Sequence, residues 1–143
     1  MDQSTGKWTY YRMGDKENAI NSDIVYSLSG DEKGNIVVGT SLGVNWINPE
    51  TGAVTSFNGT KDGRSVFEDQ IINVVFCDSR QWVWIGSNHG LHIYDRLNDK
   101  MYRLNHSSGL PDNSIMSILE DKYHTVWVGT KNGLLNIVPN RDT

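Results

Sequence analysis

The chain has 143 residues, of which 37% are hydrophobic and 21% are charged, a composition typical of a folded globular domain and not of a disordered segment. The net charge of -4 and the absence of a clustered Lys/Arg stripe argue against nucleic acid as a partner. No apolar run approaches the roughly 20 residues that membrane insertion requires, and the single cysteine, Cys77, cannot form an internal disulfide.

The first predicted element is a lone strand near the N-terminus. Residues 5–11 read Thr-Gly-Lys-Trp-Thr-Tyr-Tyr and align with residues 51–57, where a Thr-Gly turn also precedes a strand. Residues 51–57 close a repeat unit, whereas residues 5–11 stand alone. We therefore expect residues 5–11 to be an orphan outer strand.

Three tandem copies of one sequence unit follow. In each copy an Asp lies eight residues before a first Gly, and a second Gly follows the first by four residues. The first glycines are separated by 47 and 43 residues, a period typical of propeller blades. The paired glycines are Gly39 and Gly43, Gly86 and Gly90, and Gly129 and Gly133.

Each unit is expected to form four antiparallel strands, which we name A to D. Strand A is a short apolar run that ends at the Asp turn, and strand B is rich in β-branched residues and tryptophan. Trp84 and Trp127 recur in register on strand B, which indicates packing between blades. A turn that ends in the second Gly leads to strand C, and strand D is the outermost strand. The units span residues 22–57, 69–104 and 112–138, and the third lacks strand D.

These units predict an all-β fold: a β-propeller fragment of three blades, circularly offset by the N-terminal strand. Propellers close with roughly four to eight blades, so an open arc of three exposes two apolar blade faces. We expect further blades as partners. They come either from the rest of a longer chain or from a second copy, in a head-to-tail dimer that forms a six-bladed ring.

The repeat resembles the two-component regulator propeller repeat. The third unit carries the resemblance best, with Ile118-Leu119-Glu120-Asp121, Trp127-Val128-Gly129-Thr130 and Asn132-Gly133-Leu134. The resemblance implies a periplasmic sensor region of a bacterial hybrid histidine kinase, although residues 1–6 lack the features of a signal peptide. It also implies a non-catalytic sensing module without cofactor or bound metal, with an oligosaccharide as the expected ligand. No kinase motif is present in the sequence.

Candidate ligand-binding residues lie on the connections from strand D to the next strand A and from strand B to strand C. In propellers these loops surround the central channel, and their side chains here can form hydrogen bonds with sugar hydroxyls. Turns are also polar for conformational reasons alone. The candidates are Asp69, Asn88, His89, His106, Lys131 and Asn132.

Two other functions remain open from the sequence. A generic protein-interaction propeller would use an exposed rim in place of the channel. A metal-dependent lyase similar to streptogramin lyase would need several histidines that converge over the channel; His106 lies in a suitable loop, but His124 lies in a turn at the opposite edge. Trp46 and Trp82 are secondary candidates for stacking on a sugar ring.

Overall fold

The structure is a computed structural model that describes residues 6, 8–14, 19–57 and 70–138. Within these residues the chain forms eleven strands in three antiparallel sheets and one short 3-10 helix, η2 (His106–Ser108). None of the described residues forms a helix long and apolar enough to cross a membrane. The strands are β1 (Val25–Gly30), β2 (Ile36–Thr40), β3 (Gly43–Asn48), β4 (Ala53–Ser56), β5 (Ile72–Cys77), β6 (Trp82–Ser87), β7 (Gly90–Asp95), β8 (Lys100–Leu104), β9 (Ile115–Glu120), β10 (Val126–Thr130) and β11 (Gly133–Ile137).

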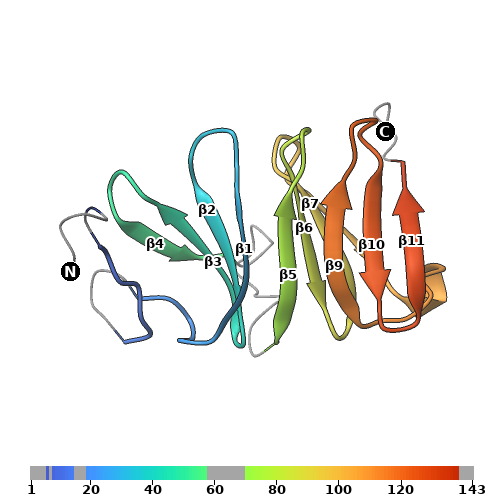
Figure 1. The fold of residues 1–143 in the computed structure, drawn as a ribbon, viewed down its shortest axis with the longest axis horizontal. Coiled ribbons are helices and arrows are strands. Elements are labelled where there is room, and N and C mark those ends of the chain that lie inside the picture. Colours follow the sequence, from blue (N-terminus) through green and yellow to red (C-terminus); the bar gives the residue numbers. More distant parts are fainter. Residues whose placement is uncertain (1–5, 7, 15–18, 58–69, 139–143) are drawn as a thin grey trace.

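The three sheets are the predicted blades. Blade 1 has the strand order β1-β2-β3-β4, blade 2 the order β5-β6-β7-β8, and blade 3 the order β9-β10-β11. The sheets stand side by side, with the first strands β1, β5 and β9 adjacent (Figure 1). The prediction of an all-β propeller fragment is confirmed. Within the described residues the third blade has three strands.

The recurring Asp organises the turn between strands A and B in every blade. In blade 2, Asp78 Oδ1 accepts hydrogen bonds from the N–H groups of Arg80 and Trp82, both at 2.9 Å. Asp78 Oδ2 accepts the indole N–H of Trp84 at 2.8 Å. Asp121 and Trp127 make the same 2.8 Å bond in blade 3. The fixed spacing of Asp and Trp therefore reflects one side-chain bond that ties the turn to strand B.

The second recurring element, a hydroxyl residue followed three positions later by Gly, closes the turn between strands B and C. Thr130 Oγ1 donates to the carbonyl of Gly133 at 2.8 Å and accepts the N–H of Asn132 at 3.1 Å. Gly133 has a φ of 127°, which side chains rarely adopt. Ser87 occupies the same place in blade 2, so either hydroxyl residue suffices.

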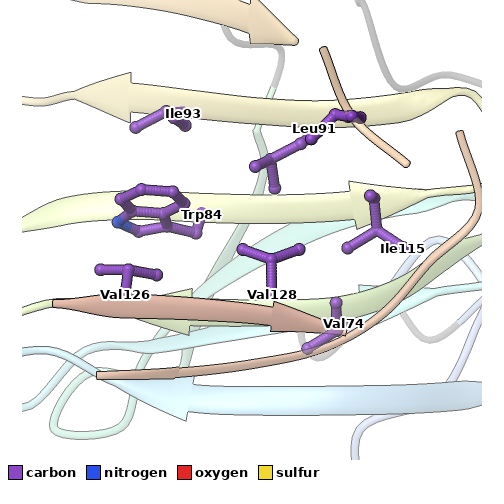
Figure 2. Packing of buried hydrophobic residues seen from close by; sticks show 8 residues of the cluster. Val74, Trp84, Leu91, Ile93, Ile115, Val126 and Val128 are labelled. Carbon is purple, nitrogen blue, oxygen red and sulfur yellow. The ribbon is translucent and has the colours of Figure 1, made fainter. Parts of the chain in front are cut away.

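The blades join through apolar faces. Trp84 is fully buried and belongs to a cluster with Leu91 and Ile93 of blade 2 and Ile115, Val126 and Val128 of blade 3. Figure 2 shows Trp84 on β6 opposite Val126 and Val128 on β10. A corresponding cluster between blades 1 and 2 contains Val37, Val44, Ile72, Val75, Val83 and Ile85.

A glycine of strand B receives an isoleucine of the next blade at both junctions. A Cβ atom on Gly86 would lie 2.5 Å from Ile115 Cγ2, and one on Gly39 would lie 2.8 Å from Ile72 Cγ2. Both distances are too short for real carbon atoms. Gly39 and Gly86 therefore each form a notch that lets strand A of the next blade, its inner strand, approach closely.

Blade 1 has Val37 where the other blades have tryptophan, and two other side chains compensate. Trp46 lies directly across from Val37 on β3 and packs against Phe57, with ring centroids 5.9 Å apart. The Arg96 guanidinium of blade 2 lies 5.0 Å from the centre of the Trp46 ring. Nη1 of Arg96 donates to Asp31 Oδ2 at 2.8 Å. In the other blades the Oδ2 atom of the equivalent Asp accepts an indole N–H instead.

Serine side chains bind the inner strand β5 to blade 1. The N–H of Val75 donates to Ser27 Oγ and the N–H of Cys77 to Ser29 Oγ, both at 3.0 Å. These are backbone groups of an edge strand, on the side away from β6. The serines therefore satisfy donors that the sheet of blade 2 leaves unpaired.

Residues 8–11 are not in a strand within the described part of the chain, but Tyr11 has a defined place. It packs against a cluster of Ile20, Val38 and Ile47 on the open side of blade 1. Phe57, which aligns with Tyr11, packs on Tyr94 of blade 2 with ring centroids 5.0 Å apart. Ile47 and Tyr94 are equivalent residues of β3 and β7.

The notch at Gly86 generates a first prediction. Gly86→Ala should lower the free energy of unfolding by about 1–3 kcal/mol, because the new methyl group overlaps Ile115 and Val74. Gly30→Ala is the control, since the nearest atom to its added Cβ is Ile36 Cδ1 at 3.9 Å. Urea unfolding of both variants measures the difference, and equal stabilities would show that no notch exists.

The contact between Arg96 and Asp31 generates a second prediction. Burial by itself raises the pKa of Asp31, but the hydrogen bonds from Arg96 and Asn35 outweigh burial and lower the pKa below its ordinary value. A lowered carboxyl pKa stabilises the fold above the unfolded-state pKa of about 3.9, and this stability is lost as the pH falls through the folded-state pKa. Arg96→Met should therefore cost about 1.5–3 kcal/mol at neutral pH and less at about pH 3.

Urea unfolding of Arg96→Met and the unmodified protein at the two pH values tests this sign. Lys122→Met, which removes a cation from the ring of the exposed Tyr123, serves as the control and should change stability by less than about 0.5 kcal/mol at either pH. A cost for Arg96→Met that stays constant with pH would contradict the role assigned to Asp31.

Candidate functional site

The turns between strands B and C lie at one edge of the blades, which we call the turn edge. It is the lower edge in Figure 1 and also carries η2, whereas the Asp turns lie at the opposite edge. The N–H of Ser41 donates to the carbonyl of Ile24, and the N–H of Lys131 to that of Ser114, both at 3.1 Å. Each of these turns is thereby fixed beside the start of its own inner strand.

Four of the predicted ligand-binding residues are exposed on the turn edge. They occupy the two-residue turns of blades 2 and 3 and are Asn88, His89, Lys131 and Asn132. The hydroxyl groups of Ser87 and Thr130 hold these turns from inside. The backbone of the candidate residues is therefore fixed while their side chains remain accessible.

Asn73 connects the turn edge to the junction of blades 2 and 3. Its Nδ2 donates to Asn88 Oδ1 at 2.9 Å and to the carbonyl of Ile115 at 3.0 Å, and lies 3.8 Å from the sulfur of Met116. One amide thus binds a turn residue of blade 2 and the first strand of blade 3. Asn73 was not among the residues predicted from the sequence, although a polar residue within the apolar run 71–76 was a usable signal.

The two remaining candidates differ in what the structure shows. His106 begins η2, is exposed, and donates its N–H to Asn113 Oδ1 at 2.6 Å. The side chain of Asn105 caps this helix by accepting the N–H of Ser108. Asp69 lies outside the described residues. The predicted residues that the structure brings to one edge are therefore those of the two turns and η2.

The histidines do not converge. His89 and His106 are on the turn edge, whereas His124 lies at the opposite edge, 3.1 Å from Ser79 Oγ. His92 is buried in β7, where burial and then the charge of Arg103 lower its pKa to about 4. It borders a hollow of about 320 Å³ with Gln70, Met101 and Arg103. Within the described ranges no three His, Cys, Asp or Glu side chains are grouped to hold a metal ion.

The two secondary tryptophan candidates are engaged in packing. Trp46 lies between Phe57 and the Arg96 guanidinium at the junction of blades 1 and 2. Trp82 is partly buried against the core of blades 2 and 3 and lies 6.1 Å from the Tyr102 ring. Neither ring is on the turn edge.

Comparison with known proteins identifies the repeat. A family model described as two component regulator propeller matches residues 109–132, which include the turn of blade 3. A search of curated proteins gives no match.

Solved structures share the fold. The extracellular domain of a hybrid two-component system from B. thetaiotaomicron matches with 25% identity and a TM-score of 0.70, over 89% of this chain and 17% of that one. A second such domain from the same organism matches with 20% identity and a TM-score of 0.76, over 92% and 19%. Virginiamycin B lyase from Staphylococcus aureus matches with 15% identity and a TM-score of 0.57, over 84% and 43%.

The chain therefore spans less than a fifth of the two extracellular domains that it resembles. The virginiamycin B lyase likeness, at 15% identity, concerns the fold alone. Residues 109–132 match the two component regulator propeller model, within a chain whose fold is that of consecutive propeller blades.

Proposed function

We propose that this chain is part of the sensing propeller of a two-component system, located outside the cytoplasm, and that it binds a polar ligand without chemical conversion. The family match and the resemblance to extracellular domains of hybrid two-component systems support this role. An oligosaccharide is the ligand class that the exposed amide, imidazole and ammonium groups of the turn edge suit.

The observation that carries the proposal is the position of Asn73. Its amide donates to Asn88 on the exposed turn and to the carbonyl of Ile115 in the next blade. A ligand that forms a hydrogen bond with Asn88 would therefore weaken or strengthen the bond from Asn73 to Asn88, and through Asn73 affect the contact between blades 2 and 3. Lys131 and Asn132 are the corresponding turn residues of blade 3. Binding across the two turns would change the relative position of blades 2 and 3, which is a signal that neighbouring blades can receive.

Calorimetric titration with a panel of oligosaccharides, with and without divalent metal, tests the proposal. We expect binding of at least one oligosaccharide in the absence of metal and no product formation. Product formation that requires metal would contradict the proposal and would indicate a lyase similar to virginiamycin B lyase. Absence of binding to the whole panel would favour a protein-interaction scaffold.

Matched lysine variants locate the site. Lys131→Ala on the turn edge should weaken binding about tenfold, the effect of one hydrogen bond to a charged group. Lys122→Ala removes an exposed lysine at the opposite edge and should leave the affinity unchanged. Equal effects of the two variants would mean that the ligand does not bind at the turn edge.

A further inference from the structure

Blade 3 presents an open face that matches the faces buried inside the chain. Gly129 corresponds to the notch residues Gly39 and Gly86, but a Cβ on Gly129 would meet only Ser117 of its own blade. Leu134 is 66% exposed, whereas the equivalent Leu91 and Val44 are 0% and 1% exposed. Around them lies a hollow of about 290 Å³, lined by Ser117, Ile118, Leu119, Trp127, Gly129 and Leu134.

Blade 1 presents the complementary face. Val25 begins the inner strand at the position of Ile72 and Ile115, the residues that fill the two notches, and is 43% exposed while both isoleucines are fully buried. Leu28 corresponds to Val75 at the junction of blades 1 and 2 and is 65% exposed against 3% for Val75. Among the described residues, blade 3 thus has a notch glycine that no other blade contacts, and blade 1 has an exposed β-branched residue at the position that fills a notch.

Within the described residues blade 3 has no fourth strand, and the N-terminal segment packs on blade 1. Within the described residues β11 pairs only with β10, so its outer edge is open. In blade 1 the strand beside β3 leads to Phe57, which packs on Tyr94 of the following blade. Tyr11 already packs on the corresponding cluster of blade 1. Residues 8–11 therefore lie where the outer strand of a blade that precedes blade 1 would end.

We propose that a second copy of this chain docks its blade 1 onto the open face of blade 3, head to tail. Val25 of the second copy enters the notch at Gly129, and its residues 8–11 lie along β11. Ser117 faces the backbone of Leu28 as Ser27 faces that of Val75. Two such junctions close a ring of six blades, within the usual range of roughly four to eight.

The two faces differ, which gives the association a direction. Blade 3 offers a notch and blade 1 offers the side chain that fills a notch, so two identical faces cannot fill each other. The contact is therefore heterologous, and the ring closes only when each copy uses both of its faces. This inference is independent of the ligand proposed above.

Substitutions at the exposed leucines test the proposal by light scattering coupled to size exclusion, at about 100 µM, far above the Kd of an ordinary interface. The unmodified chain of 16.1 kDa should elute at twice that mass. Leu134→Glu and Leu28→Glu should each reduce the mass to 16.1 kDa. Both side chains are exposed in the single chain, so the fold should survive, which circular dichroism can check.

A mixture of the two variants gives the decisive measurement. In a mixed pair, the Leu28→Glu copy supplies an intact Leu134 and the Leu134→Glu copy supplies an intact Leu28, so one junction contains both leucines. A mixture of equal amounts of the two variants should therefore restore the doubled mass. Leu97→Glu is the matched control, because Leu97 is 74% exposed in the turn between β7 and β8, away from both faces, and should leave the mass doubled.

Three results would overturn the proposal. The first is an unmodified chain that remains a single copy at this concentration, which would mean that blades from a longer chain or from a different polypeptide cover the faces. The second is a Leu28→Glu variant that stays double, which would indicate contact between identical faces. The third is a mixture of Leu28→Glu and Leu134→Glu in which both remain single.

Discussion

The close approach of each inner strand to the blade before it is the constraint on which the structure depends. Ile72 and Ile115 enter notches at Gly39 and Gly86 that exist only because these residues lack a side chain. Around each notch the apolar residues of strands A, B and C form one continuous cluster shared by two blades. A blade of three or four strands has too little interior of its own, so its neighbour supplies the other half of its core.

The close packing between blades constrains the combined side chains of facing positions more than the residue at any single position. Blade 1 lacks the strand B tryptophan, but a tryptophan lies directly across the sheet at Trp46, so the same face still carries an indole. The Asp of the turn then receives Arg96 in place of the indole N–H. Volume and charge are both preserved although the motif is not, which explains how repeats of different sequence form equivalent junctions.

The fold was predictable from the sequence because each sequence signal for it has a local cause. The period, the turn that ends in Gly133 and the fixed spacing from Asp121 to Trp127 all arise from contacts within one blade. Contacts between blades left weaker signals. Arg96 and Asn73 act on residues 65 and 42 positions away, and nothing in their immediate sequence indicates those partners.

The candidate site was predictable to a similar extent. The turns that carry Asn88 and Lys131 are at one edge because strands B and C alternate in direction, which the repeat already implied. The link from Asn88 through Asn73 to the next blade was not predictable, since it requires the distance between two sheets. What the sequence lacked in each case was the relative placement of neighbouring blades.

The serines of β1 affect how the unpaired backbone groups at the edge of the neighbouring sheet are satisfied. An inner strand is the edge of its sheet, and free backbone groups on an edge strand invite addition of a strand from another molecule. Ser27 and Ser29 occupy donors of β5, and Asn73 occupies the Ile115 carbonyl of β9. Short polar side chains of one blade thus protect the next against β-aggregation, without the lysine or proline that edge strands commonly use.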